Sequence, residues 1–100
     1  MPKFSVTVPH QLTREQAVER LSHFTERVKK DFGDQVSDLE QSWEGNVLHF
    51  RFKTFGFTIK GDLVADAPEV KMNGEIPFAA MMFKGKIEQS IHDELSKLLR

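Results

Sequence analysis

The chain has no cysteine and no tyrosine among its 100 residues, and only six glycines and four prolines. The absence of cysteine excludes a disulfide framework, a thiolate nucleophile and a cysteine-based zinc site. The absence of tyrosine removes the phenol as an acid–base group, although nine phenylalanines are present. The longest apolar run covers residues 77–83, far short of the roughly 20 residues that span a bilayer. We therefore expect no transmembrane segment.

The chain also lacks an excess of charge of either sign. Fourteen Lys and Arg oppose 15 Asp and Glu, which gives a net charge of −1. Such a chain has no overall field that attracts nucleic acid or an anionic membrane. Its first residues lead into an alternating segment and not into the apolar run of a signal peptide. We therefore expect a cytoplasmic protein, folded as one domain over residues 1–100, that binds no nucleic acid.

The N-terminal third predicts a strand followed by a helix. Apolar and polar residues alternate from Phe4 to Val8, which is the period of a half-buried strand. Thr13 and Gln16 form a capping box, and Gly33 suits the left-handed position after a last turn. The apolar positions between them recur every three or four residues: Ala17, Leu21, Phe24, Val28 and Phe32. We therefore expect one continuous helix from Thr13 to Gly33.

From residue 36 to residue 76 the apolar period changes to two. Turns at residues 44–46, 54–56 and 65–68 separate the alternating runs, a pattern typical of antiparallel hairpins. The inner face is expected to hold Leu48, Phe50, Phe52, Phe57, Ile59, Gly61, Leu63, Val70, Met72, Gly74 and Ile76, and Trp43 shares one face of its strand with Leu39 and Gln41. Because only one face is apolar, this sheet needs one covering layer.

The C-terminal residues predict a second helix. Its apolar stripe is Phe83, Ile87, Ile91, Leu95 and Leu98. Pro77 and Gly85 predict a loose or broken turn over residues 77–85, followed by a firm helix to Leu99. Glu88 and Glu94 are expected on the solvated side. The order β-α-β-β-β-β-α predicts an α+β domain, in which both helices cover one face of an antiparallel sheet.

The patterns that carry catalysis or metal binding are incomplete. Gly85-Lys86 lacks the first glycine and the Ser or Thr of a phosphate loop. The histidines, His10, His23, His49 and His92, show no metal-ligand spacing and are expected on solvated faces, with His49 the least implausible general base or zinc ligand. The carboxylates are exposed in the predicted elements, and no serine lies in a nucleophile elbow. We therefore expect a non-enzymatic protein that holds no metal and no cofactor.

The polar face of the predicted sheet carries charges of both signs. Its bases are Lys3, Arg51, Lys53, Lys60 and Lys71, and its acids are Asp38, Glu40, Asp62, Glu69 and Glu75. A platform for nucleic acid needs aromatic side chains among the bases, whereas the strand phenylalanines lie on the other face. The local group of His49, Arg51, Lys53 and Lys60 leaves a small anion-binding patch as an alternative.

Residues 76–83 hold more apolar side chains than one helix face can bury. The surplus is Phe78, Met81, Met82 and Phe83, followed by Lys84 and Lys86, whose long side chains can snorkel. One interpretation is that this segment closes the end of the core. The functional interpretation is an apolar contact surface for a hydrophobic partner, a lipid-like ligand or an apolar particle.

Several short motifs together resemble one small bacterial family. They are Trp43-Glu44-Gly45, the residues Phe50, Phe52, Gly56 and Gly61, the pair Ile76-Pro77 and the run from Phe83 to Glu88. Over essentially its whole length the chain resembles the polyhydroxyalkanoic acid system (granule-region) family, encoded near genes for storage polyester and its granules. The order of elements is also similar to a minimal helix-grip domain of the START and Bet v 1 kind.

The family resemblance implies an accessory protein of polyhydroxyalkanoate storage that contacts a polyester granule or a granule protein. The family offers no assigned catalytic residues. The helix-grip likeness implies an alternative, a small acyl ligand held between the sheet and the C-terminal helix. Its lining would be Trp43, Phe50, Phe52, Phe57, Met72 and Ile91. A third hypothesis is a homodimer that covers the unpaired edge of the sheet.

Overall fold

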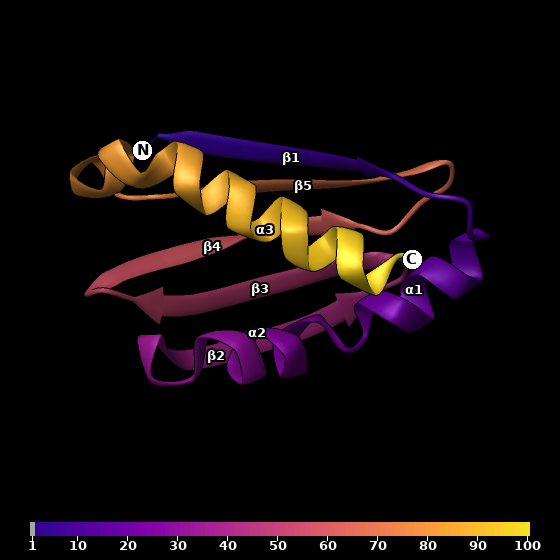
Figure 1. Cartoon of the computed structure of the whole chain (residues 1–100), viewed down its shortest axis with the longest axis horizontal. Helices are drawn as coiled ribbons and strands as arrows, with labels where there is room; N and C mark the ends of the chain where they lie inside the picture. Colours follow the sequence, from indigo (N-terminus) through magenta and orange to yellow (C-terminus); the bar gives the residue numbers. More distant parts are fainter. Residues whose placement is uncertain (1) are drawn as a thin grey trace.

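The computed structural model describes residues 2–100, which form a five-stranded antiparallel sheet with helices against one face (Figure 1). The strands are β1 (Lys3–Pro9), β2 (Val36–Glu44), β3 (Val47–Thr54), β4 (Phe57–Val64) and β5 (Glu69–Glu75). The helices are α1 (Arg14–Leu21), α2 (Phe24–Phe32) and α3 (Lys84–Leu98), with short 3₁₀ segments η1 (Gly33–Gln35) and η2 (Phe78–Phe83). Within the described residues, no helix combines the length and the apolarity that crossing a membrane requires.

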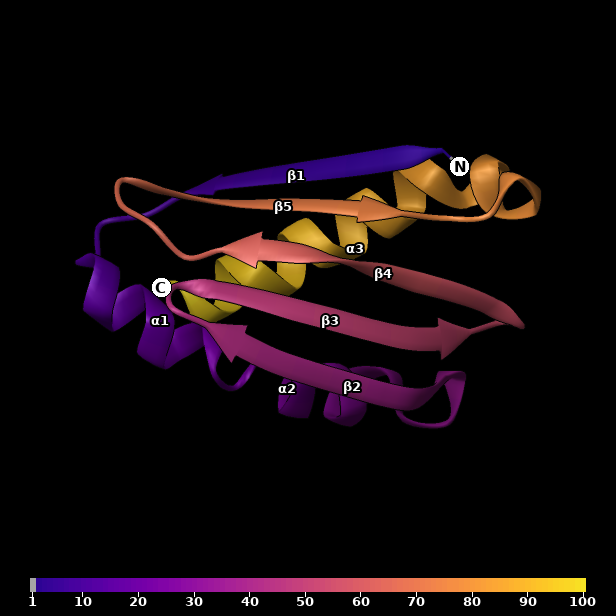
Figure 2. The same cartoon turned by 180° about the vertical axis from the view of Figure 1, so that it is seen from behind.

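The first strand lies at one edge of the sheet, beside the last one. The strand order is β1-β5-β4-β3-β2, so the chain travels from one edge to the other through α1 and α2 before the meander begins. Figure 2 shows the molecule from behind, where the helices leave the second face of the sheet uncovered. The α+β class, the order of elements and the single covering layer predicted from the sequence are confirmed.

The expectation of one continuous helix from Thr13 to Gly33 is wrong in one respect, because the helix breaks at Ser22 and His23. The capping box at Thr13 and Gln16 is present. Ser22 donates its hydroxyl hydrogen to the carbonyl of Glu19, a local bond that competes with regular helix. His23 has φ −95° and ψ 4°, outside the helical region. The break lets α1 close the end of the sheet while α2 runs along β2 (Figure 1).

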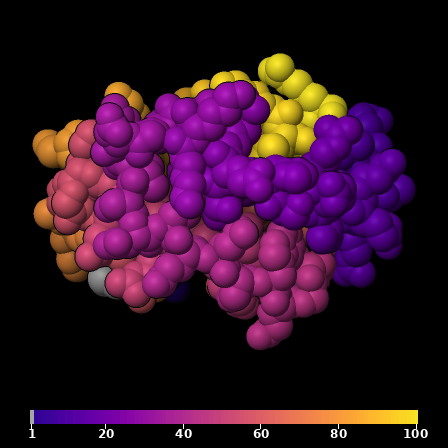
Figure 3. All heavy atoms as spheres, turned by 90° about the horizontal axis from the view of Figure 1, so that it is seen from below, coloured from indigo at the N-terminus to yellow at the C-terminus, as the bar shows by residue number. Residues whose placement is uncertain are grey.

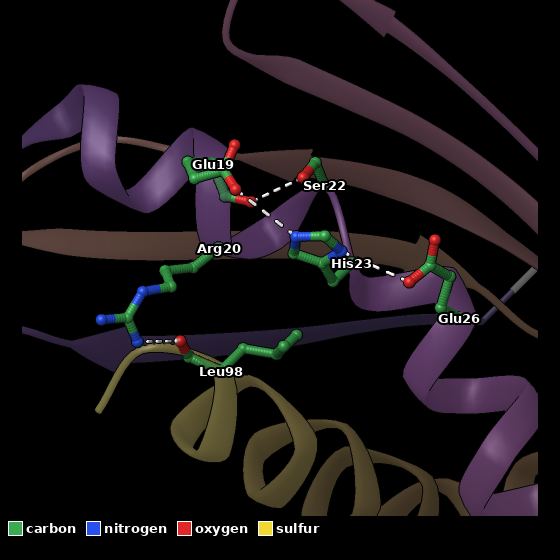
Figure 4. Close-up of polar contacts among 6 residues, drawn as sticks. All are labelled: Glu19, Arg20, Ser22, His23, Glu26 and Leu98. Atoms are coloured by element: carbon green, nitrogen blue, oxygen red, sulfur yellow. Dashed lines mark hydrogen bonds and ion pairs between the residues drawn. The ribbon is translucent and has the colours of Figure 1, made fainter.

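Charged side chains pair with one another around this break (Figure 4). The His23 ring lies between two carboxylates, with Nε2 at 3.4 Å from Glu19 and Nδ1 at 3.3 Å from Glu26. Arg20 reaches across to α3 and donates to the carbonyls of Leu98 at 3.2 Å and Arg100 at 2.6 Å. The end of α3 has unpaired carbonyls that favour such a cation. The junction therefore ties α1 to the C-terminus.

Two glycines lie opposite each other at the centre of the sheet, and a phenylalanine flanks each. The register pairs Phe4 with Gly74, Gly74 with Gly61, and Gly61 with Phe50. A Cβ on Gly74 would overlap the Phe4 ring, and one on Gly61 would lie 2.9 Å from Phe50 Cζ. Glycine is therefore required at both positions, because the two rings occupy the space of the missing side chains.

A partly buried ion pair joins α2 to α3, and its burial of Glu94 corrects the expectation that this residue faces solvent. Glu94 is only 5% exposed, and its carboxylate accepts a hydrogen bond from Arg27 Nε at 2.8 Å. Desolvation raises the pKa of the Glu94 carboxyl above its usual range, the neighbouring Asp31 carboxyl raises it further, and Arg27 opposes both effects. Glu88 is also half-buried, since it accepts the backbone N–H of Ser5 on the free edge of β1 at 3.1 Å.

Gly61→Ala is expected to lower the free energy of unfolding by about 2 kcal/mol or more, because the new methyl group would overlap the Asn73 carbonyl and lie 2.8 Å from Gly74 Cα. Gly85→Ala is the matched control. It meets no atom within 4 Å and lies in the first turn of α3, so alanine there should raise stability by up to about 1 kcal/mol. Urea unfolding measures both, and equal midpoints for the two variants would contradict the packing described here.

The raised pKa of His23 predicts a pH-dependent contribution to stability. Hydrogen bonds to Glu26 and Glu19 raise the pKa of this imidazole above 6.5. Because the folded pKa exceeds the unfolded one, the stabilisation is complete below the unfolded pKa and is lost as the pH rises through the folded pKa. His23→Gln should therefore reduce stability more at about pH 5 than at about pH 8. Unfolding curves at both pH values test this, with His92→Gln on the exposed side of α3 as the control. A pH-independent effect of His23→Gln would refute it.

Candidate functional site

Five large apolar side chains are exposed at one end of the molecule. We call them the apolar end: Phe55, Phe78, Met81, Met82 and Phe83. Met82 is 82% exposed, Phe55 74% and Phe78 73%. They come from two places, the β3–β4 turn and η2, which lie at the same end of the sheet, at the left in Figure 1. The surplus apolar residues predicted from the sequence are thus at the surface, and their role as a contact surface stays a prediction.

The 3₁₀ geometry of η2 explains why these side chains point outwards. Such a helix has three residues per turn, and in η2 only Ala80 is buried against the core. The ring of Phe83 lies 6.4 Å from that of Phe57, at the start of β4. This contact connects η2 to the strand that leaves the β3–β4 turn. The apolar end is therefore held by packing at its base while Phe78 and Met82 extend into solvent.

Phe55 belongs to the apolar end but was not predicted from the sequence, where residues 54–56 were expected only to form a turn. Phe55 and Gly56 both have positive φ, 51° and 80°, as a tight two-residue hairpin turn requires. Asparagine or glycine adopts this conformation readily, whereas other residues lose roughly 1–2 kcal/mol. A phenylalanine that is strained and also exposed adds nothing to the core. This mismatch between residue and turn is the signal that could have identified it.

Lys84 and Lys86 border the apolar end from the first turn of α3. A helix N-terminus carries a partial positive charge, so cations there are unfavourable by roughly 0.3–1 kcal/mol each. No acidic residue occupies this turn. Within residues 2–100, neither ammonium lies within ion-pair distance of a carboxylate. The two lysines predicted as part of the contact surface therefore lie where α3 alone would not favour them.

The uncovered face of the sheet is hollowed. A depression of about 710 Å³ crosses all five strands and has the backbone of Gly61 and Gly74 at its floor. Its polar lining includes Lys3, Glu40, Ser42, His49, Arg51, Lys60, Asp62, Asn73 and Glu75. Viewed from the β2 edge, the molecule shows an indentation between two lobes on this side (Figure 3). A smaller hollow of about 350 Å³ adjoins it, lined by Arg51, Thr58, Lys60, Glu75 and Pro77.

The polar side chains of this face form cross-strand pairs. His49 pairs through Nδ1 with Asp62 on the neighbouring strand. Arg51 lies 3.8 Å from Glu40, and Lys60 lies 3.8 Å from Glu75. Lys53, which the sequence grouped with these bases, pairs with Asp38 at 3.4 Å and lies outside the linings of both hollows. The predicted group of four bases is thus reduced to His49, Arg51 and Lys60 around the hollows.

The side chains predicted to line an acyl site pack against the core. Phe50, Phe52, Met72 and Ile91 are buried, while Trp43 and Phe57 are half-buried. The Phe50 ring contacts those of Phe24 and Phe52, with centroids at 6.0 and 6.2 Å. Apart from Phe50, which borders the larger hollow, none of the six lines either hollow. A ligand between sheet and helix would have to displace this packing, so the acyl site stays a prediction.

The remaining histidines make local contacts. His10 bridges the Asp66 carbonyl at 2.6 Å and the Leu12 N–H at 3.0 Å, and His92 lies 3.8 Å from Asp93. Within residues 2–100, no three His, Asp or Glu side chains come together as metal ligands would.

Both edge strands of the sheet carry a feature that hinders pairing with a further strand. On β1, the carboxylate of Glu88 accepts the backbone N–H of Ser5, and on β2 a bulge between Ser37 and Glu40 distorts the strand. A homodimer through an edge stays a prediction.

Comparison with known proteins adds one finding. The family model of polyhydroxyalkanoic acid system proteins matches residues 4–99, nearly the whole chain. No curated protein matches the chain at a significant level. The match includes every strand and helix except the first residue of β1.

Phe55→Asn is expected to stabilise the protein by about 1 kcal/mol, because asparagine tolerates positive φ and little burial is lost at a side chain 74% exposed. Phe57→Asn is the contrasting variant: it removes the contact with Phe83 and should destabilise. Thermal or urea unfolding measures both. A loss of stability in Phe55→Asn would show that the exposed ring contributes to the fold.

Proposed function

The chain belongs to the polyhydroxyalkanoic acid system protein family, and we propose that it acts in that system as a non-enzymatic binding protein that rests its apolar end on the polyester surface of the granule. The observation that carries this proposal is the clustering of five exposed apolar side chains at one end of a small domain. Exposed patches of this kind mark interaction sites. The occupant is a particle surface, because the side chains project from a turn and a short helix and do not enclose a cleft.

The energetics fit reversible attachment. Fully burying a Phe or Met side chain contributes about 1.5–3 kcal/mol, and several of the five would be buried only in part. Association also costs translational and rotational freedom. The net affinity of one molecule is therefore modest, which suits a protein that adds to and leaves a growing or shrinking particle. Even with this modest affinity, many molecules together could cover the surface of one particle.

The base of the apolar end is organised before binding. Ala80 is fully buried and Phe83 lies against Phe57, so the backbone of η2 does not have to order on contact. Preorganisation of this kind reduces the cost of binding. Lys84 and Lys86 can lay their aliphatic stems along an apolar surface while their ammonium groups remain hydrated or contact ester oxygens. These contacts would also offset the unfavourable interaction of both cations with the helix dipole at the start of α3.

Replacement of Phe78 and Met82 by glutamate should abolish sedimentation with purified polyester particles. Both side chains are more than two-thirds exposed, so the fold should tolerate the change, while a buried carboxylate at the contact is strongly unfavourable. The matched control is Gln11→Glu with Ala67→Glu, which adds the same charge at exposed positions near the other end of the sheet. The control should sediment like the unchanged protein.

Equal sedimentation of the two double variants would overturn the role of the apolar end. Loss of binding in both would indicate attraction by overall charge instead of apolar contact. Phe55→Asn separates stability from binding, because it should raise the unfolding temperature and yet weaken attachment.

A further inference from the structure

The two hollows on the uncovered face share a pair of cations. Arg51 and Lys60 line both of them, and the register places these residues directly opposite each other on β3 and β4. Like charges at opposite positions destabilise a sheet. Glu40 and Glu75, each 3.8 Å from one of these bases, offset part of this repulsion, and an anion between the two side chains would offset it further.

Each of the two cations is only loosely paired within the protein. Their nearest carboxylates, Glu40 for Arg51 and Glu75 for Lys60, lie at 3.8 Å, which is beyond hydrogen-bond distance. Each cationic side chain is about half exposed, and among residues 2–100 neither makes a hydrogen bond through its side chain. The N–H groups of both therefore remain available to a ligand in the hollow.

The surrounding charges select the kind of anion. Lys3, Arg51 and Lys60 are balanced by Glu40, Asp62 and Glu75 in the lining of the larger hollow. A lining without net charge offers little attraction for a doubly charged phosphate. A carboxylate also matches the planar fork of an arginine.

The smaller hollow leads from the cations towards the apolar end. It passes Thr58, which follows Phe57 in β4, and Pro77, which precedes η2. A molecule with its carboxylate at Arg51 and Lys60 could thus extend an aliphatic chain along this path.

We propose that the uncovered face of the sheet binds an aliphatic carboxylate, with the head group between Arg51 and Lys60 and the chain directed past Thr58 and Pro77. This site goes beyond the proposed attachment to a polyester surface and uses different residues. Glu75 lies in both hollows and pairs with Lys60, so it competes with the ligand for the ammonium group.

Titration of the ¹⁵N-labelled protein with octanoate, below the concentration at which it aggregates, tests this inference. Amide shifts should move at Arg51, Thr58 and Lys60. Acetate, which lacks the chain, and octanol, which lacks the charge, should each bind about tenfold more weakly.

Variants of the charged residues make the test specific. The double variant Arg51→Gln, Lys60→Gln should weaken octanoate binding about tenfold. Lys53→Gln is the matched control, since Lys53 lies on the same face of β3 outside both hollows, and it should change affinity by less than about twofold. Glu75→Gln removes the competing carboxylate and should tighten binding about threefold. A variant that merely damaged the fold would not show this gain.

The inference is overturned if octanoate moves no amides of β3 and β4, if octanol binds as well as octanoate, or if the double variant binds as tightly as the Lys53→Gln control. Shifts confined to η2 and the β3–β4 turn would also overturn it, and would leave attachment through the apolar end intact. Conversely, octanoate binding with no sedimentation on polyester particles would support this site and contradict the proposed function.

Discussion

The row of residues Phe4, Gly74, Gly61 and Phe50 is the constraint on which both faces of the sheet depend. On the inner face, the two rings fill the space above the glycines and give the helices a continuous apolar surface to cover. On the other face, the same glycine backbones form the floor of the larger hollow. A side chain at either glycine would collide with its neighbours, so the packing of the core and the shape of the exposed face cannot be changed independently.

Three departures from local preference occur around the apolar end and the hollows beside it. Phe55 has a positive φ that favours asparagine or glycine. Lys84 and Lys86 lie at the helix end that favours anions, and Arg51 lies opposite Lys60. In natural proteins, each residue usually matches the local conformation and charge environment that the fold requires, and mismatches occur mainly at functional sites. The distribution of these departures agrees with the functions proposed for the two surfaces.

The sequence predicted those features that depend on local pattern. The alternation in residues 47–76 placed Phe50 and Met72 inside, and the Thr13 capping box began a helix where expected. Features that depend on tertiary distance were not predictable. Glu94 is buried because Arg27, on another helix, lies 2.8 Å away, and β1 joins β5 by a long-range pairing. The hollows required the register of the whole sheet, including the β3–β4 pairing that places Arg51 opposite Lys60. Phe55 could have been found from the turn chemistry alone.

Attachment of the apolar end to a polyester surface is the central claim, and the methionines provide a direct test of it. Met81 and Met82 are exposed in the apolar end, whereas Met72 is fully buried in the sheet and serves as the internal reference. The oxidation rate of each can be followed by mass spectrometry with and without polyester particles. The account predicts that particles protect Met81 and Met82 and leave the slow oxidation of Met72 unchanged. Bound protein in which Met82 oxidises as fast as in free solution would contradict it.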